Sequence, residues 1–76
     1  MKSFRLSINH RGKHFNGEVF PLHDSGIQGI PLSYKVELEG KNYGIIHCGK
    51  DKWVSAEIED QSLVNAIGSY IHAWYE

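Results

Sequence analysis

Apolar and polar residues alternate at the start of this chain. Phe4, Leu6 and Ile8 are separated by single polar residues, a spacing typical of a strand with one buried face. Residues 3–10 are therefore predicted to form a strand. A second strand is predicted over residues 13–20, after a turn at Arg11-Gly12.

The apolar positions also predict the register of this first hairpin. If Arg11 and Gly12 form the loop, one face holds the pairs Ile8–Phe15, Leu6–Gly17 and Phe4–Val19. On the other face Arg5 lies opposite Glu18, a cross-strand charge pair. A shift by one residue would turn one strand's apolar set to the wrong face, so the register is well specified.

A second hairpin is predicted from residues 32–39 and 42–48. Gly40-Lys41 fits a type II′ turn, which favours glycine at its first central position. This loop places Val36 opposite Ile45 and Tyr34 opposite His47, on the face that carries the apolar residues. Ile46 then faces the other side of the sheet.

The fifth strand, residues 53–58, has two alternative registers. A four-residue loop after residue 48 puts Val54, Ala56 and Ile58 on the core side and leaves Trp53 on the outer face. A three-residue loop reverses the faces and buries Trp53. We favour the four-residue loop because three apolar positions agree with it.

The final segment, residues 60–75, has the pattern of one amphipathic helix. Asp60 is a suitable N-cap, since its carboxylate can accept hydrogen bonds from the free amides of the first turn. Gly68 adjoins the apolar stripe, where it costs about 1 kcal/mol of helix propensity relative to alanine, and we expect close approach of helix and sheet to offset this cost. The stripe contains Leu63, Val64, Ile67, Tyr70, Ile71, Trp74 and Tyr75.

These elements predict an α+β fold for a single domain spanning residues 1–76. The sheet is five-stranded, antiparallel and meander-like, and the C-terminal helix packs on one of its faces. The other face can remain open to water, as antiparallel sheets allow.

Composition narrows the classes of function. The net charge is −1 and the eight basic residues are scattered, which argues against nucleic acid because each contacted phosphate needs its own Lys or Arg. No apolar run approaches the roughly 20 residues of a membrane helix. Cys48 is the only cysteine, so an intramolecular disulfide is impossible. We therefore expect a cytoplasmic protein that binds neither nucleic acid nor membranes.

The hairpins, the segment Gly-Lys-Asp-Lys-Trp-Val over residues 49–54 and the helix segment Leu-Val-Asn-Ala-Ile-Gly-Ser-Tyr-Ile over residues 63–71 resemble a type of short, uncharacterised bacterial protein. In those proteins a small sheet ends in a helix with a Leu-Val-x-x-Ile-Gly pattern. The resemblance covers nearly the whole chain and implies the same fold. It implies no activity.

The five histidines do not form a catalytic or metal signature. His10 and His14 fall on opposite faces of the first hairpin, and a metal site normally needs three or four converging ligands. His23-Asp24 is typical of a turn.

His47 and Cys48 are neighbours on a strand, so their side chains point to opposite faces and cannot act as a nucleophile and base. We expect His47 on the inner face, opposite Tyr34, and Cys48 on the outer face.

We accordingly predict no enzyme activity, no metal and no cofactor. The leading hypothesis is a protein–protein interaction module, with an unknown partner or a second copy of the chain, that uses the open sheet face or a sheet edge. Its candidate surface residues are Trp53, Phe20, Ile46 and Lys35. The alternative is a small-ligand or metal-binding protein that uses His47, Tyr34 and the loop around His23.

Overall fold

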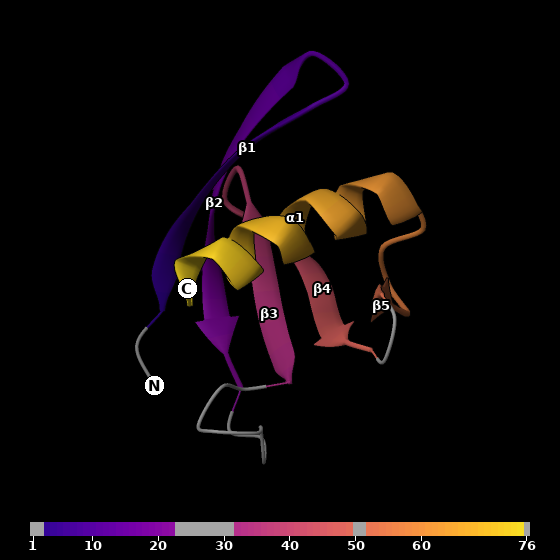
Figure 1. The fold of residues 1–76 in the computed structure, drawn as a ribbon. Helices are drawn as coiled ribbons and strands as arrows, with labels where there is room; N and C mark the ends of the chain where they lie inside the picture. The colour runs from indigo at the N-terminus through magenta and orange to yellow at the C-terminus, as the bar shows by residue number, and fades with distance from the viewer. Residues whose placement is uncertain (1–2, 23–31, 50–51, 76) are drawn as a thin grey trace.

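The computed structural model describes residues 3–22, 32–49 and 52–75. Five strands form one antiparallel sheet in chain order, and a C-terminal helix lies across one face of it (Figure 1). The predicted α+β architecture is confirmed. The elements are β1 (Phe4–His10), β2 (Lys13–Pro21), β3 (Ser33–Leu38), β4 (Lys41–Cys48), β5 (Trp53–Ser55) and α1 (Gln61–Trp74).

The first hairpin has the predicted register. Phe4 pairs with Val19, Leu6 pairs with Gly17, and His10 pairs with Lys13 beside the loop. Arg11 and Gly12 both have positive φ, 55° and 76°, as a two-residue type I′ turn requires. This turn matches the right-handed twist of the strands and fixes the alternation of buried and exposed residues along β1.

The second hairpin differs from the prediction. Its loop is Glu39-Gly40, with φ values of 52° and 78°, so Leu38 pairs with Lys41 and the turn is type I′. The register then shifts between Val36 and Glu37. This irregularity lies beside Gly44, whose φ of 123° disfavours any residue with a side chain.

The register shift turns β4 over from Gly44 onward relative to the predicted pairing, whereas the change of loop moves the pairing by two residues and leaves the faces unchanged. Tyr34 pairs with Ile46 instead of His47, and Ile46 is fully buried beneath the helix. The outer-face position predicted for Ile46 is therefore wrong, as is the inner-face position predicted for His47, which is exposed.

The same change reverses β5. Cys48 pairs with Trp53 across a four-residue loop, the loop length we favoured. Ile46 points inward, however, so Cys48, two positions further along β4, points inward as well. Trp53 is the cross-strand partner of Cys48 and therefore lies on the same face. The predicted outer positions of Trp53 and Cys48 are therefore wrong. Val54 faces outward with 37% of its surface exposed.

The core lies between the sheet and α1. Val64, Ile67 and Ile71 of the helix are at most 1% exposed, and burial of each such side chain contributes about 1.5–3 kcal/mol. Asp60 caps the helix as predicted, accepting from the backbone amides of Ser62 and Leu63. Within the described residues, no helix is long and apolar enough to cross a membrane. The sheet residues of this core include Leu6, Val19, Val36, Leu38 and Ile46.

Candidate functional site

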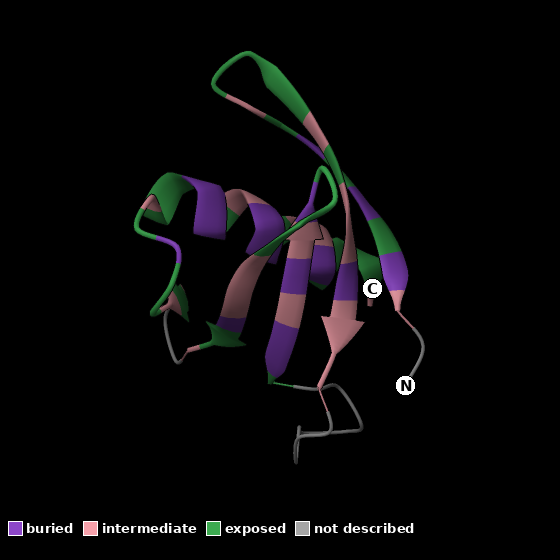
Figure 2. Cartoon of the chain, turned by 180° about the vertical axis from the view of Figure 1, so that it is seen from behind, coloured by how far each residue is buried: buried purple, intermediate pink, exposed green. Residues whose placement is uncertain are grey.

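The sheet face opposite α1 is the main candidate surface. Figure 2 views the molecule from this side, with the strands in front of the helix. None of the elements in the described ranges packs over it: the contacts of α1 with the sheet bury the inward side chains. This face is therefore open to a partner in a way that the helix-covered face is not.

A row of partly apolar side chains crosses the centre of this face. Phe20 pairs with Lys35, and Lys35 pairs with Ile45 on the next strand. His47 and Val54 form the adjoining cross-strand pair. We call these five residues the outer patch; they come from four consecutive strands and, except for exposed His47 and Val54, are half-buried.

Local contacts hold the polar members of the outer patch in place. The Lys35 ammonium lies 4.9 Å from the centre of the Phe20 ring, a cation–π contact. It is also 3.6 Å from a carboxylate oxygen of Glu37. On the other side of the patch, His47 Nδ1 is hydrogen-bonded to Ser33 Oγ at 2.8 Å. The patch therefore combines apolar area with a fixed cation and a fixed imidazole.

Only part of the predicted interaction surface comes together here. Phe20 and Lys35 lie side by side on the outer face, whereas Ile46 and Trp53 lie on the helix side. Ile45 and Val54 take their places, and sequence reasoning missed both. The missed signal was Gly44, because a glycine within a strand often marks an irregularity in pairing.

The predicted ligand-binding residues do not converge. Tyr34 is 1% exposed and faces α1, whereas His47 faces outward. Burial, followed by the charge and hydrogen bond of Tyr75, raises the pKa of Tyr34 above its usual range. Its ring lies 5.8 Å from the ring of Trp53, so it acts as a core aromatic with a neutral hydroxyl. The third candidate, His23, lies outside the described residues.

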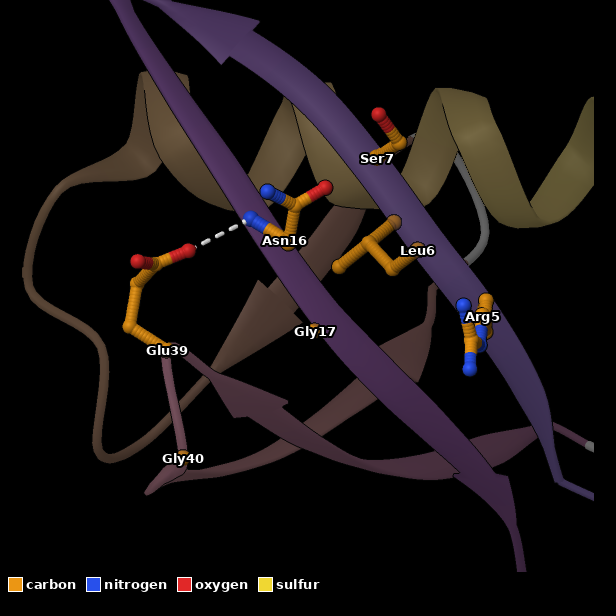
Figure 3. A pocket seen from close by; sticks show the side chains of 7 residues that line it. All are labelled: Arg5, Leu6, Ser7, Asn16, Gly17, Glu39 and Gly40. Atoms are coloured by element: carbon orange, nitrogen blue, oxygen red, sulfur yellow. Dashed lines mark hydrogen bonds between the residues drawn. The ribbon is translucent and has the colours of Figure 1, made fainter.

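A separate polar recess lies beside the first hairpin (Figure 3). It has a volume of about 600 Å³, and β1, β2 and the β3–β4 turn line it. Glu39 closes one side by accepting a hydrogen bond from the Asn16 amide at 2.7 Å, and Arg5 lies on the other. Among the described residues Arg5 forms no ion pair. Glu18, its cross-strand partner, accepts a hydrogen bond from Ser3.

The histidines of the first hairpin serve local hydrogen bonds. His14 contacts Asn9 Oδ1 at 2.8 Å and Ser7 Oγ at 3.0 Å. His10 contacts Ser62 Oγ at 2.7 Å and so links the hairpin to the first turn of α1. In the described part of the chain, no three His, Cys, Asp or Glu side chains are grouped as metal ligands would be.

Cys48 lies at the end of β4 and is exposed. Its Sγ is 3.8 Å from the carbonyl oxygen of Gly49, and its strand neighbour His47 points to the other face. The geometry therefore gives this thiol no base from His47, and no nucleophilic mechanism follows from the pair.

In comparisons with protein-family models, with curated proteins and with solved structures, no match was found.

Proposed function

We propose that this protein is a small, non-enzymatic protein–protein interaction module and that the outer patch is its binding surface. The observation that supports the proposal is the row of Phe20, Lys35, Ile45 and Val54 on the sheet face that none of the described elements covers. Apolar side chains grouped on a surface mark interaction sites more often than scattered ones do.

The chemistry of the patch fits a protein partner better than a small molecule. Small-molecule sites are concave and enclose most of the ligand, whereas the outer patch lies on the open face of a sheet. An aromatic ring and two aliphatic side chains resemble the centre of a protein interface, where aromatic residues anchor the contact, and the Lys35 cation suits its polar rim.

Site-specific photo-crosslinking in the native cell tests this proposal. A photoreactive phenylalanine analogue at Val54 is expected to give discrete adducts, because this side chain is 37% exposed in the patch. The same analogue at Ser69, which is exposed on α1 and lies outside the sheet, is the matched control and is expected to give none.

A second substitution separates a specific partner from chance collisions. Phe20→Ser removes the aromatic member of the patch without touching position 54, and it should abolish the Val54 adducts. Adducts that persist in Phe20→Ser, or an equal yield from Ser69, would contradict the assignment of the outer patch.

A further inference from the structure

The backbone of β1 has a definite hydrogen-bonding direction at each residue. Asn16 of β2 directs its backbone groups toward β3, since its carbonyl accepts from the Glu39 amide at 2.8 Å and its own amide donates to the Glu39 side chain. Because these directions alternate along an antiparallel strand, Phe15 and Gly17 direct theirs toward β1. Their partners Ile8 and Leu6 therefore direct theirs toward β2.

The intervening residues of β1 direct their backbone groups away from the sheet. By the same alternation, the amides and carbonyls of Arg5, Ser7 and Asn9 face the free edge. Strand order places β1 at one end of the sheet, and no strand within the described ranges pairs with this side of it. The edge thus presents a regular row of donors and acceptors.

The two edges of the sheet are not equivalent. β5 is three residues long, and the chain leaves it toward the helix. β1 is a regular seven-residue strand. It contains no proline and no bulge, two of the features by which proteins block unwanted pairing of strand edges. β1 is therefore the edge suited to accept another strand.

A second copy of β1 fits this edge by symmetry. With a twofold axis at Ser7, antiparallel pairing sets Leu6 opposite Ile8 and Arg5 opposite Asn9. Leu6 and Ile8 are buried on the helix side while Arg5 and Asn9 are exposed on the other, so both faces continue across the seam. The register puts no like charges opposite each other, and the hydrogen-bonding residues of the two copies coincide.

The end of α1 supplies apolar surface on the same side of the sheet. Trp74 is stacked on Phe4 of β1 at a centroid distance of 4.5 Å and an interplanar angle of 6°. It nevertheless remains 55% exposed. In the symmetric pairing Phe4 lies opposite His10 of the second copy, so Trp74 would lie over the seam between the two sheets.

We propose that β1 joins two copies of this chain edge to edge, as one continuous ten-stranded sheet with both helices on the same face. The interaction uses the free backbone groups of Arg5, Ser7 and Asn9, with Trp74 as its apolar contact. It uses the β1 edge instead of the outer patch and does not rest on the function proposed for that patch.

Amide hydrogen exchange measured by NMR at low and high protein concentration tests the proposal. The amides of Arg5, Ser7 and Asn9 should exchange rapidly in dilute protein and become protected as concentration rises. The amides of Leu6 and Ile8 should be protected at both concentrations, because they bond to β2. Sedimentation velocity over the same range should show a monomer–dimer equilibrium.

Substitution at the twofold axis provides a matched pair of variants. Ser7→Pro removes the edge-facing amide of both copies and leaves the β1–β2 ladder intact, so it should weaken dimerisation about tenfold or more. Ser7→Ala also loses the hydroxyl contact with His14 but keeps the amide, and it should dimerise like the wild type.

Three results would overturn the proposal: a monomer at every concentration, a Ser7→Pro variant that dimerises as tightly as Ser7→Ala, or a dimer in which the three edge amides stay unprotected. If Ser7→Pro does not fold, Trp74→Ala replaces it, and dimerisation as tight as wild type would then count against the proposal. Because Val54 and Phe20 are not in the edge, failure here leaves the crosslinking test of the outer patch unaffected.

Discussion

Gly68 and Trp53 provide the sharpest test of how the helix packs on the sheet. A Cβ atom at position 68 would lie 2.3 Å from two atoms of the Trp53 indole, well inside van der Waals contact. The indole is a rigid ring, and the Trp53 carbonyl is itself held by Gln61 Nε2 at 2.7 Å. Gly68→Ala therefore requires the strand and helix to separate.

Two opposing terms set the size of the effect. Replacing glycine by alanine within a helix stabilises it by about 1 kcal/mol, whereas overpacking a tight contact costs about 1–3 kcal/mol. Since the clash involves a ring and not a flexible chain end, we expect Gly68→Ala to lower the free energy of unfolding by about 1 kcal/mol. For a domain of this size that corresponds to a Tm lower by about 4–8 °C.

A double-mutant cycle isolates the contact. In a Trp53→Val background the indole is absent, so Gly68→Ala should raise the free energy of unfolding by about 1 kcal/mol through helix propensity alone. The coupling energy between the two positions would then be about 2 kcal/mol. Ser69→Ala, at the next and exposed helix position, serves as control and should be neutral or slightly stabilising in both backgrounds.

Urea unfolding followed by circular dichroism measures all these variants. If Gly68→Ala stabilises the wild-type protein as much as it stabilises Trp53→Val, the indole does not contact the helix. That result would return Trp53 to the outer face and contradict the register described for β4 and β5.

Three further predictions follow from the fold. Ile46→Ala should cost about 2–5 kcal/mol because Ile46 is fully buried, whereas Ile45→Ala should cost less than about 1 kcal/mol; equal losses in urea unfolding would contradict the observed register. The pKa of Asp60 is lowered, chiefly by the Ser62 side chain and then by the Leu63 amide and Arg11, so its stabilising effect is present above about pH 4 and lost as pH falls through the folded-state pKa. Asp60→Asn keeps a capping residue and should flatten this acid limb of a pH–stability profile, and an unchanged limb would show that the carboxylate is not its source. Arg11→Asn should raise Tm, with a gain of about 0.5–1 kcal/mol, because asparagine tolerates the positive φ of 55° better than arginine; a lower Tm would show that the exposed contact of Arg11 with Asp60 at 3.8 Å outweighs the backbone strain.

The first hairpin could be predicted from the sequence because only one register satisfies its residues. Phe4, Leu6 and Ile8 find apolar or glycine partners only when Arg11-Gly12 forms the loop, and a type I′ turn accepts glycine at its second position. The helix could be predicted equally well from the sequence, because Asp60 marks its start and the apolar stripe marks its buried face. In both segments turn or cap chemistry and periodicity agree.

The second hairpin could not be predicted in the same way because two loops compete for one glycine. Gly40 can be the first residue of a type II′ turn with Lys41 or the second of a type I′ turn with Glu39, and the structure has the latter. The alternation of apolar and polar residues along a strand does not show where one extra residue interrupts the pairing with the neighbouring strand. The irregularity beside Gly44 therefore exchanged the faces of Ile45 and Ile46 without changing the number of apolar residues in the pattern.

The composition of the candidate site depends on this single exchange. With the predicted register the outer face would carry Trp53 and Ile46; with the observed one it carries Val54 and Ile45, so the open face loses an indole and the core gains it. Gly68 was the residue that could have indicated the buried position of Trp53, because a glycine on the apolar stripe of a helix leaves room for one large side chain from the opposing sheet. In the favoured alignment Trp53 was the one large apolar residue of β5 left on the outer face. Its contact with Gly68 accounts both for the glycine within the helix stripe and for the absence of an indole from the open face.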